Sequence, residues 1–475
     1  MQWTRRQFSI LAIVAITSFM GTFLISSINI ALPAIEREFS IHAVALGWVV
    51  TAFLLSSATL LLPMGRIADL SGVRRIFKIG VSIFTLSSLL CAFAHSGNWL
   101  IAFRAVQGVG AALTSTTGTA ILITAFAPNQ KGRVLGISVA AVYIGLATGP
   151  FFGGLLTQTL GWRSVFISSF ILGLIVMLIT RRYLGKDEIS DFNAFRKLRL
   201  WGSLFYILGL SALVYGSSLI PETRGWLIML LGAMSFIVFW RIESRSEFPV
   251  FHTRLFTHNR LFAYSNIAAL INYSSTFAIV FLLSFYLQKV KGLAPHAAGT
   301  VLVAQPIMMA VFSPLAGRLS ERIQPRYLAT IGMSICAIGL AALSFLQADT
   351  PLPLIVGILL WVGLGFALFS SPNMNTIMSS VEANAYAQAS GTAGTMRVVG
   401  QIVSMTIATF FFALHMGKTH MEEVANDDFM LAQHKAFVVF ALIALVGIYF
   451  SWYRGYLTPS ASRSKSPSHY LSDFK

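Results

Sequence analysis

The sequence has 475 residues, of which 56% are hydrophobic and 11% are charged, and its mean hydropathy is +0.74. Soluble domains carry about 25% charged residues, so this composition excludes a soluble globular enzyme, and the high hydropathy excludes intrinsic disorder. The net charge of +17 fits a membrane protein with Lys and Arg on its cytoplasmic loops, and we expect no nucleic-acid partner.

Fourteen apolar runs lie between the charged clusters, and a membrane-spanning helix needs about 20 such residues. In chain order the runs begin near Phe8, Ala43, Ile76, Trp99, Val134, Val165, Leu200, Trp226, Leu261, Ala297, Tyr327, Leu352, Tyr386 and Ala436. The first run continues to Ala31 without a small-residue cleavage site, so we expect a retained helix rather than a signal peptide. The eighth run is the weakest, because only sixteen residues separate Arg224 from Arg241.

Lys and Arg fall mainly on one side of these segments. With a cytoplasmic N-terminus, 25 of them face the cytoplasm, 7 lie on the other side, and Arg104 and Arg397 fall within apolar runs. Positive residues concentrate on the cytoplasmic side, so we expect both termini in the cytoplasm and an even number of spans. Cys91 and Cys336 also lie in apolar runs, which predicts neither a disulfide framework nor a metal site.

Two short segments repeat at an offset of 252 residues: Gly65–Asp69 matches Gly317–Glu321, and Arg74 falls on Arg326. Parallel repeats are a known transporter architecture, with the substrate site between the two halves. We therefore predict four regions: a six-helix bundle over 1–185, a linker with two inserted transmembrane helices over 186–260, a second six-helix bundle over 261–457, and a disordered cytoplasmic tail over 458–475.

Several motifs resemble those of one transporter family. The segment Gly65–Arg75 is similar to the signature loop of the major facilitator superfamily, except that Leu70 replaces the basic residue usual after the acid. The segment Arg104–Ala112 resembles the helix-4 motif of that superfamily, and Gly145–Gly154 resembles the motif of its drug:proton antiporters. Two further stretches resemble the fourteen-helix drug antiporters, namely Pro249–Phe256 and Ser371–Asn375.

This resemblance implies an all-α polytopic membrane protein of the major facilitator fold, with two six-helix bundles, two inserted helices and fourteen transmembrane helices in all. It implies a secondary active transporter of the multidrug efflux type, which exports amphiphilic small molecules by proton antiport and alternating access. The expected setting is the cytoplasmic membrane of a bacterium or archaeon, where a multi-pass monomer works with protons, its substrate and the lipid bilayer as partners. We expect no enzymatic activity, cofactor or metal.

Asp69 and three arginines, Arg66, Arg74 and Arg75, are candidate gating residues. A carboxylate beside arginines on a tight, glycine-flanked turn can hold a charge network or face the N-terminus of a helix. The resemblance implies that this loop latches the two halves while the outside is open, and Leu70 removes one partner from the latch. The alternative is a solvated loop with ordinary cytoplasmic charges.

Arg104 is a candidate coupling residue near the outer end of the fourth segment. A charged side chain within the membrane is costly and usually faces an interior cavity and a partner. Gln107 lies one turn further on the same helix face and can share this polar path. The resemblance implicates Arg104 in proton coupling, and the alternative is an arginine that snorkels to the outer interface.

Gly145, Gly149 and Gly153 recur every fourth residue, so they share one helix face and permit close backbone approach. Pro150 bends this helix, and Gly154 widens the smooth patch. We expect a sliding contact between the two halves along this face. The alternative is an ordinary packing seam of small residues.

The substrate cavity is expected to be large and mostly apolar, with a few polar groups. Its candidate polar residues are Asn29, Asn272, Tyr273, Asn373 and Asn375, and its candidate aromatic walls are Phe53, Trp361 and Phe369. Arg397, the second intramembrane cation, is a further candidate; its alternatives are snorkelling or pairing with a helix dipole. Each residue alone is more readily explained by helix packing than by contact with a ligand.

None of the seventeen acidic residues falls at mid-membrane, and Leu24 occupies the position where many antiporters of this type carry an Asp. We hypothesise that Glu36 or Asp69 carries the proton and that Arg104 tunes that step by lowering the pKa of a nearby acid. The alternative for Glu36 is a solvated charge on an outer loop. Without a membrane acid, neutral, zwitterionic or anionic substrates are at least as plausible as cationic ones.

Two other functions stay open from the sequence. One is a dedicated exporter of a single metabolite or anionic compound, and the other is a lipid-handling membrane protein without proton coupling. A membrane-embedded enzyme is disfavoured, because no His/Asp/Glu cluster or nucleophile motif appears within the predicted helices.

Overall fold

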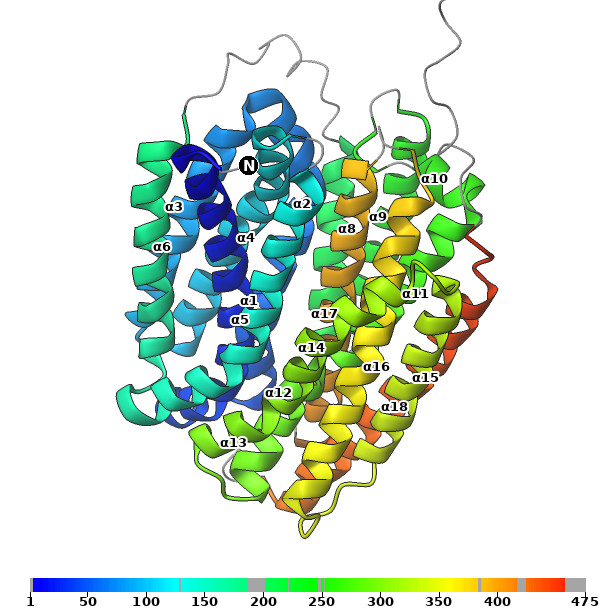
Figure 1. Cartoon of the computed structure of the whole chain (residues 1–475). Helices are drawn as coiled ribbons and strands as arrows, with labels where there is room; N and C mark the ends of the chain where they lie inside the picture. The colour runs from blue at the N-terminus through cyan, green and yellow to red at the C-terminus, as the bar shows by residue number, and fades with distance from the viewer. Residues whose placement is uncertain are drawn as a thin grey trace, which may run out of the picture.

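The computed structural model describes residues 3–127, 130–185, 201–220, 222–246, 249–251, 253–382, 386–416 and 424–457. In these segments the regular structure is helical, with no β-strand, so the expectation of an all-α protein is confirmed. Figure 1 shows two groups of long helices side by side, the first blue to cyan and the second green to red. The predicted tail, 458–475, lies outside the described residues.

Six long helices form the first half: α1 (Arg5–Phe39), α2 (Ala43–Ser71), α3 (Val73–Ala92), α4 (Gly97–Ala125), α5 (Lys131–Leu160) and α6 (Arg163–Tyr183). A capping box between Thr4 and Gln7 starts α1, and Gly72, with a φ of 98°, separates α2 from α3. We call the side on which α1 begins and α2 ends the terminal side, and the opposite side the far side.

The second half contains shorter pieces and four long helices: α10 (Thr253–His258), α11 (Arg260–Thr276), α12 (Ala278–Phe285), a π-helical turn (Tyr286–Val290), α13 (Pro295–Leu302), α14 (Ala304–Leu319), α15 (Pro325–Leu343), α16 (Leu352–Ser379), α17 (Tyr386–Met416) and α18 (Asn426–Tyr453). α18 begins ten residues before the predicted Ala436, because Asp427 and Asp428 stabilise its first turn against the helix dipole.

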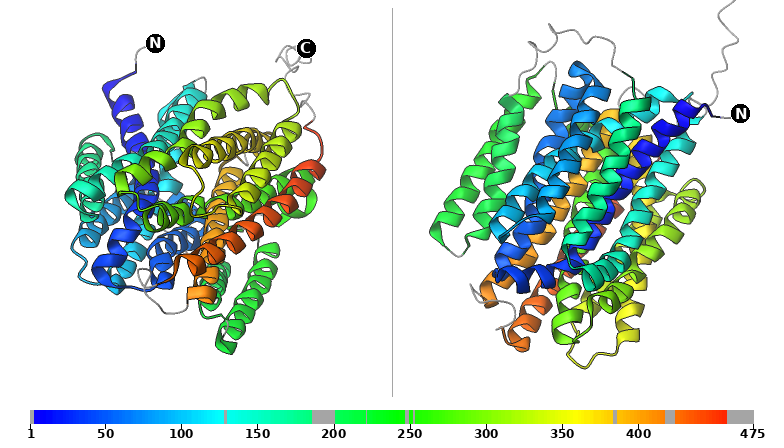
Figure 2. Two further views of the ribbon diagram at one scale, coloured as in Figure 1. Left: turned by 90° about the horizontal axis from the view of Figure 1, so that it is seen from below. Right: turned by 90° about the vertical axis from the view of Figure 1, so that its left-hand side faces the viewer.

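Two helices between the halves, α8 (Trp201–Ser218) and α9 (Thr223–Ser244), form a hairpin on the outside of the bundle, drawn in green in Figure 2. Gly209 faces Gly232 and Gly216 faces Gly225, and an added β-carbon at any of the four would lie 2.7–3.2 Å from the partner's carbonyl oxygen. The hydroxyl of Tyr206 on α8 donates a 3.1 Å hydrogen bond to the carbonyl of Ala58 on α2. The hairpin is therefore a tightly packed unit that contacts the first half.

Thirteen helices or joined helices in the described segments are long and apolar enough to cross a membrane. The exception among the fourteen predicted segments is α8, because glycine, serine, tyrosine and tryptophan dilute its apolar run. The expectation that the eighth segment is the weakest is therefore wrong: α9 has 22 residues and qualifies. Its outer face carries exposed apolar side chains such as Trp226, Leu230 and Leu231, as lipid contact requires.

Candidate functional site

Four side chains gather at one depth in the middle of the molecule, and we call them the central group. Tyr143 on α5 belongs to the first half, and Tyr273 on α11, Phe366 on α16 and Arg397 on α17 belong to the second. Each lies eleven to thirteen residues from the terminal-side end of its helix, which is about 16–20 Å along the axis. Tyr273 meets the Phe366 ring edge-on at 5.3 Å and lies within electrostatic range of Arg397 and Tyr143.

Arg397 has no hydrogen bond or ion pair with any residue in the described segments. Its side chain is partly exposed, as are those of Tyr143 and Tyr273, although all three lie well inside their helices. A guanidinium at this depth is costly unless water or an anion solvates it. The central group therefore combines an unpaired cation with aromatic rings and phenolic hydroxyls from both halves.

The two halves touch near the far side. An added β-carbon at Gly154 on α5 would collide with the carbonyl of Pro295 on α13, and one at Gly299 on α13 would collide with the carbonyl of Pro150. The amide of Gln288 donates to the carbonyl of Ile30 on α1 at 3.0 Å, and the backbone N–H of His296 donates to Gln158 at 3.2 Å. These contacts lie on the far side of the central group.

The seam of Gly145, Gly149 and Gly153 does not lie between the halves. Added β-carbons at these three positions would meet α1, at Thr22, Ser26 and Ser27 respectively. The hydroxyls of Ser26 and Ser27 donate to the carbonyls of Leu146 and Gly149 at 3.2 and 2.9 Å. The expected sliding contact along this face is therefore wrong: a helical repeat defines a smooth face but not its partner, and that partner is α1 of the same half. Of the five candidate residues on α5, Pro150 and Gly154 contact the other half.

Arg104 on α4 is fully buried in a polar network inside the first half. Its Nε donates to the carbonyl of Val49 at 3.0 Å, and its Nη1 donates to Oε1 of Gln107 at 2.6 Å. Gln107 in turn donates to the hydroxyl of Ser88 at 2.7 Å, and the guanidinium lies 4.3 Å from the centre of the Phe53 ring. Arg104 does not snorkel to the outer interface, and Phe53 is its stacking partner rather than an open wall.

The segment Gly65–Arg75 is mostly helical rather than a loop, since α2 continues to Ser71 and α3 begins at Val73. The helix continues through Pro63 and Gly65, and the chain turns at Gly72, which has a positive φ. The side chains of Arg66 and Asp69 lie outside the described part of the chain, and Arg74 and Arg75 each have an interaction partner. Arg74 and its repeat mate Arg326 are each the second residue of a helix.

A model of the Major Facilitator Superfamily matches residues 11–405 and 267–469. The chain belongs to this superfamily. The riboflavin transporter RibZ of Clostridioides difficile is 30% identical over 94% of this chain and 96% of its own length. The multidrug resistance protein Stp of Mycobacterium tuberculosis is 32% identical over 84% of this chain and 75% of its own length.

A further relative and a solved structure are also similar to this chain. The methylenomycin A resistance protein of Bacillus subtilis is 27% identical over 84% of this chain and 86% of its own length. A solved bacterial homologue of the human lysosomal transporter Spinster, in an inward-facing and unoccupied conformation, has 15% sequence identity and a TM-score of 0.69 over 95% of this chain and 98% of its own. The major facilitator fold is confirmed, and the chain is a multi-pass membrane transporter.

Two aromatic residues expected at the transporter's cavity lie elsewhere. Trp361 is 46% exposed, and its ring lies beside Gly339 on α15. Phe369 is buried in a cluster with Ala269, Met333 and other residues of α11 and α15. These expectations are wrong because a uniformly apolar helix does not show from its sequence which face turns inward; Phe366 is the residue of α16 that meets Tyr273.

The four candidate asparagines of the transporter pack within its halves. Asn373 donates to the carbonyl of Ser265 at 3.0 Å and accepts from Arg454 at 2.7 Å, while Asn375 donates to Ser320 at 3.0 Å. Asn29 donates to the carbonyl of Ile25 at 3.1 Å, and Asn272 is fully buried. Asn29, Asn272 and Asn373 are at most 2% exposed, so the structure does not bring the asparagines into the central group.

Arg454 is a functional candidate that the sequence does not reveal, because it falls among the ordinary cytoplasmic charges. Its side chain is buried at the end of α18, and among the described residues only its Nη1, which donates to Asn373, has a hydrogen-bond partner. Burial lowers the pKa of Arg454 to about 9, with the charge of Arg326 as a second cause, so it stays charged at neutral pH. Its position just after an apolar run gave no signal that distinguishes it from a solvated arginine.

A second missed residue, Glu243, holds the stretch that joins the inserted hairpin to the second half. Its Oε2 accepts from the backbone N–H groups of Val250 and Phe251 at 2.6 and 3.0 Å, and its side chain is 3% exposed. The Phe251 ring packs on Phe239 and Phe256, with centroids 6.0 and 5.0 Å apart. Flanking arginines made this acid look like part of a solvated charge cluster.

Glu36, near the far end of α1, is 4% exposed and has an interaction partner. The alternative that it is a solvated charge on an outer loop is therefore wrong. The helix continues past it to Phe39, and Ser40, with a φ of 47°, then ends the helix. Glu36 stays a candidate for proton transfer.

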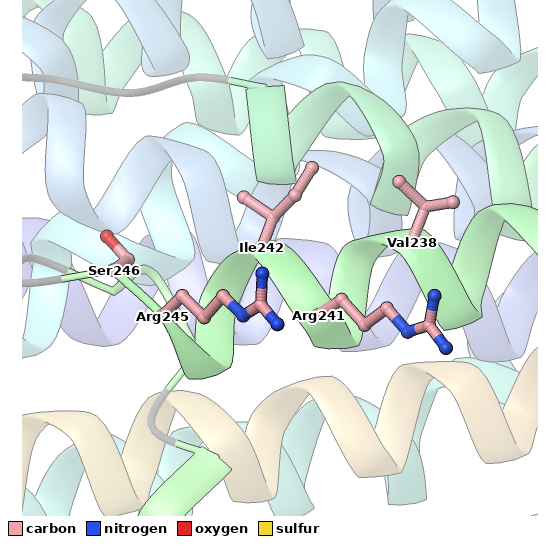
Figure 3. Close-up of a pocket in the computed structure, with 5 residues that line it drawn as sticks. All are labelled: Val238, Arg241, Ile242, Arg245 and Ser246. Atoms are coloured by element: carbon pink, nitrogen blue, oxygen red, sulfur yellow. The ribbon is translucent and has the colours of Figure 1, made fainter.

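A surface pocket of about 440 Å³ lies at the terminal-side end of α9, lined by Val238, Arg241, Ile242, Arg245 and Ser246. Figure 3 shows the two arginines extending in the same direction from one face of this helix. All five residues belong to the last turns of α9 or directly follow it, so this pocket lies apart from the central group. The described segments hold no group of His, Cys, Asp and Glu that could bind a metal ion.

Proposed function

We propose that the chain exports amphiphilic small molecules in exchange for protons and that the central group binds the substrate. The observation that supports this most is the position of that group: Tyr143 from one half and Tyr273 and Arg397 from the other lie at mid-depth. Transporters built from repeats bind substrate at such an interface and rock their halves around it.

The contacts between the halves support alternating access. Added β-carbons at Gly154 and Gly299 would collide with the backbone of the other half. The two halves therefore pack backbone to backbone on the far side, where this conformation is closed. Opening this end requires α5 and α13 to separate. In our proposal Asp69, Arg66, Arg74 and Arg75 then gate the terminal side, which is cytoplasmic, and Arg104 and Gln107 act in coupling.

The names of the relatives favour export of toxic compounds. Stp is named for multidrug resistance, and the relative from Bacillus subtilis is named for resistance to methylenomycin A. The similarity to RibZ, named as a riboflavin transporter and matched over 94% of this chain, supports a second candidate, the dedicated transport of one metabolite.

Growth of an efflux-deficient bacterial host that expresses the chain separates these candidates. A panel of anionic, neutral and cationic toxic amphiphiles is tested with the wild type and with empty vector, and cellular accumulation is measured with and without a protonophore. Tolerance of several unrelated compounds, with accumulation restored by the protonophore, is the expected result. Tolerance of a single compound supports the dedicated transporter, and unchanged accumulation of every compound contradicts export.

A further inference from the structure

The charges around the central group are of one sign. Every acidic residue in the described segments lies in a loop or within a turn of a helix end, and Asp69 lies two residues before the end of α2. Three described cations, Arg104, Arg397 and Lys435, lie well inside their helices, and Lys435 is exposed and bonds to His415. Arg104 already donates two hydrogen bonds and stacks on Phe53. Arg397 is therefore the cation left available to a ligand.

The aromatic residues beside Arg397 define the shape of the ligand that fits. The Tyr273 ring is fixed edge-on against Phe366, and Ser370 stands beside its hydroxyl. Tyr143, from the opposite half, stacks on no aromatic ring in the part of the chain that the structure describes. A flat ring in this region can stack on or meet the edges of these side chains, and such aromatic pairs contribute about 0.5–1.5 kcal/mol each.

Resting on the proposed function, we infer that the substrates of this site are aromatic anions: Arg397 binds the acidic group, and Tyr143 and Tyr273 hold the ring from both halves. A guanidinium presents several N–H donors in a plane and suits the oxygens of a carboxylate, sulfonate or phosphate. An ammonium-bearing ligand would meet an uncompensated Arg397 instead. The site thus selects by charge sign as well as by shape.

Binding to the purified protein in lipid nanodiscs tests this inference without requiring transport. Three probes share one naphthalene ring: naphthalene-2-sulfonate, the neutral naphthalene-2-sulfonamide and the cationic 2-naphthyltrimethylammonium. Equilibrium dialysis, with empty nanodiscs as background, gives the dissociation constant of each. We expect the sulfonate to bind wild type at least tenfold more tightly than the sulfonamide, and the cation to bind most weakly.

Variants assign the preference to named residues. Arg397→Gln is expected to abolish the tenfold preference while still binding the sulfonamide, and Arg397→Lys is expected to keep part of it. Tyr273→Leu and Tyr143→Leu are expected to weaken the sulfonate and the sulfonamide by the same factor. Arg260→Gln is the matched control, because Arg260 is an exposed arginine of the same half that stacks on Tyr264 at 5.0 Å.

Two results overturn the inference: a wild type that binds the sulfonamide or the cation as tightly as the sulfonate, or an Arg397→Gln variant that is folded and keeps the preference. Unfolding of the variant is excluded by its sulfonamide binding and its melting temperature. A wild type that binds the sulfonate selectively but exports no compound leaves this inference standing and contradicts the proposed function. Export of neutral and cationic compounds alone contradicts this inference and leaves the proposed function standing.

Discussion

Gly299 on α13 packs directly on the carbonyl of Pro150 on α5, so the two halves of the transporter meet there backbone to backbone. No side chain larger than hydrogen fits between them. We expect Gly299→Val to push the halves apart on the far side and to lower the rate of transport at least tenfold. Spin labels on Leu160 and Phe345, which are 71% and 79% exposed, report the far-side distance, and the buried native cysteines do not compete for labelling.

Gly357→Val is the control for this experiment, because an added β-carbon at Gly357 meets nothing within 4 Å. It is expected to leave both the distance and the rate unchanged. Normal transport by Gly299→Val with an unchanged distance between the labels would show that this contact does not govern closure.

The glycines of α5 that face α1 lead to a different expectation. Gly149→Leu places a side chain where a β-carbon alone would lie 2.5 Å from Cβ of Ser26. Overpacking of this kind costs about 1–3 kcal/mol, so substrate binding, turnover and the melting temperature should fall together. Gly136→Leu, at an open position of the same helix, should be tolerated. A stable Gly149→Leu protein that binds substrate but does not turn over would instead make this seam a moving contact.

The Arg104 network predicts a stability effect at its neighbour. Gln107→Met removes the acceptor of Arg104 Nη1 and leaves a second buried N–H of this guanidinium unpaired, since Nη2 already lacks a partner. A buried donor left unsatisfied on a charged group costs about 2–3 kcal/mol. Ser88→Ala, which removes only the acceptor of Gln107, should cost less. Denaturant unfolding in mixed micelles measures both, and a Gln107→Met loss no greater than that of Ser88→Ala would contradict the assigned network.

Glu243 predicts how the inserted hairpin is held. Glu243→Ala leaves the N–H groups of Val250 and Phe251 without their acceptor and should lower stability by about 1–3 kcal/mol. Glu243→Gln keeps one carbonyl oxygen and should lose much less. The melting temperatures of wild type and the two variants, together with their rates of protease cleavage at 245–251, measure this loss of stability. Equal stability of Glu243→Ala and wild type would show that the carboxylate does not anchor this segment.

The helix positions could be predicted because their signals are local. Apolar runs between charged residues gave thirteen of fourteen starts within a few residues, and the spacing of Arg104 and Gln107 on one helix face predicted that they share a polar path. The apolar run predicts a start of α18 that is ten residues too late, because the polar first turn with Asp427 and Asp428 precedes the run.

Partnerships between helices could not be predicted in the same way. The repeat of Gly145, Gly149 and Gly153 shows that a neighbour comes close but not that the neighbour is α1. The apolar sequence of α16 also does not show which face turns inward, and Phe366 rather than the expected Trp361 meets Tyr273. Arg454 and Glu243 read as solvated charges because burial at a helix end depends on packing that the local sequence does not record.

Proton-coupled movement of an aromatic anion tests the central claim most directly. Wild-type proteoliposomes with an acidic lumen that contains pyranine receive naphthalene-2-sulfonate outside, and probe uptake and lumenal pH are followed together. Our account predicts that the sulfonate accumulates while the lumen becomes more alkaline, and that a protonophore prevents the accumulation. With Arg397→Gln we expect neither accumulation of the sulfonate nor alkalinisation of the lumen. With Arg260→Gln we expect both, as in wild type. Failure of the wild type to take up the sulfonate, or uptake that leaves the lumenal pH unchanged and is indifferent to the protonophore, would contradict it.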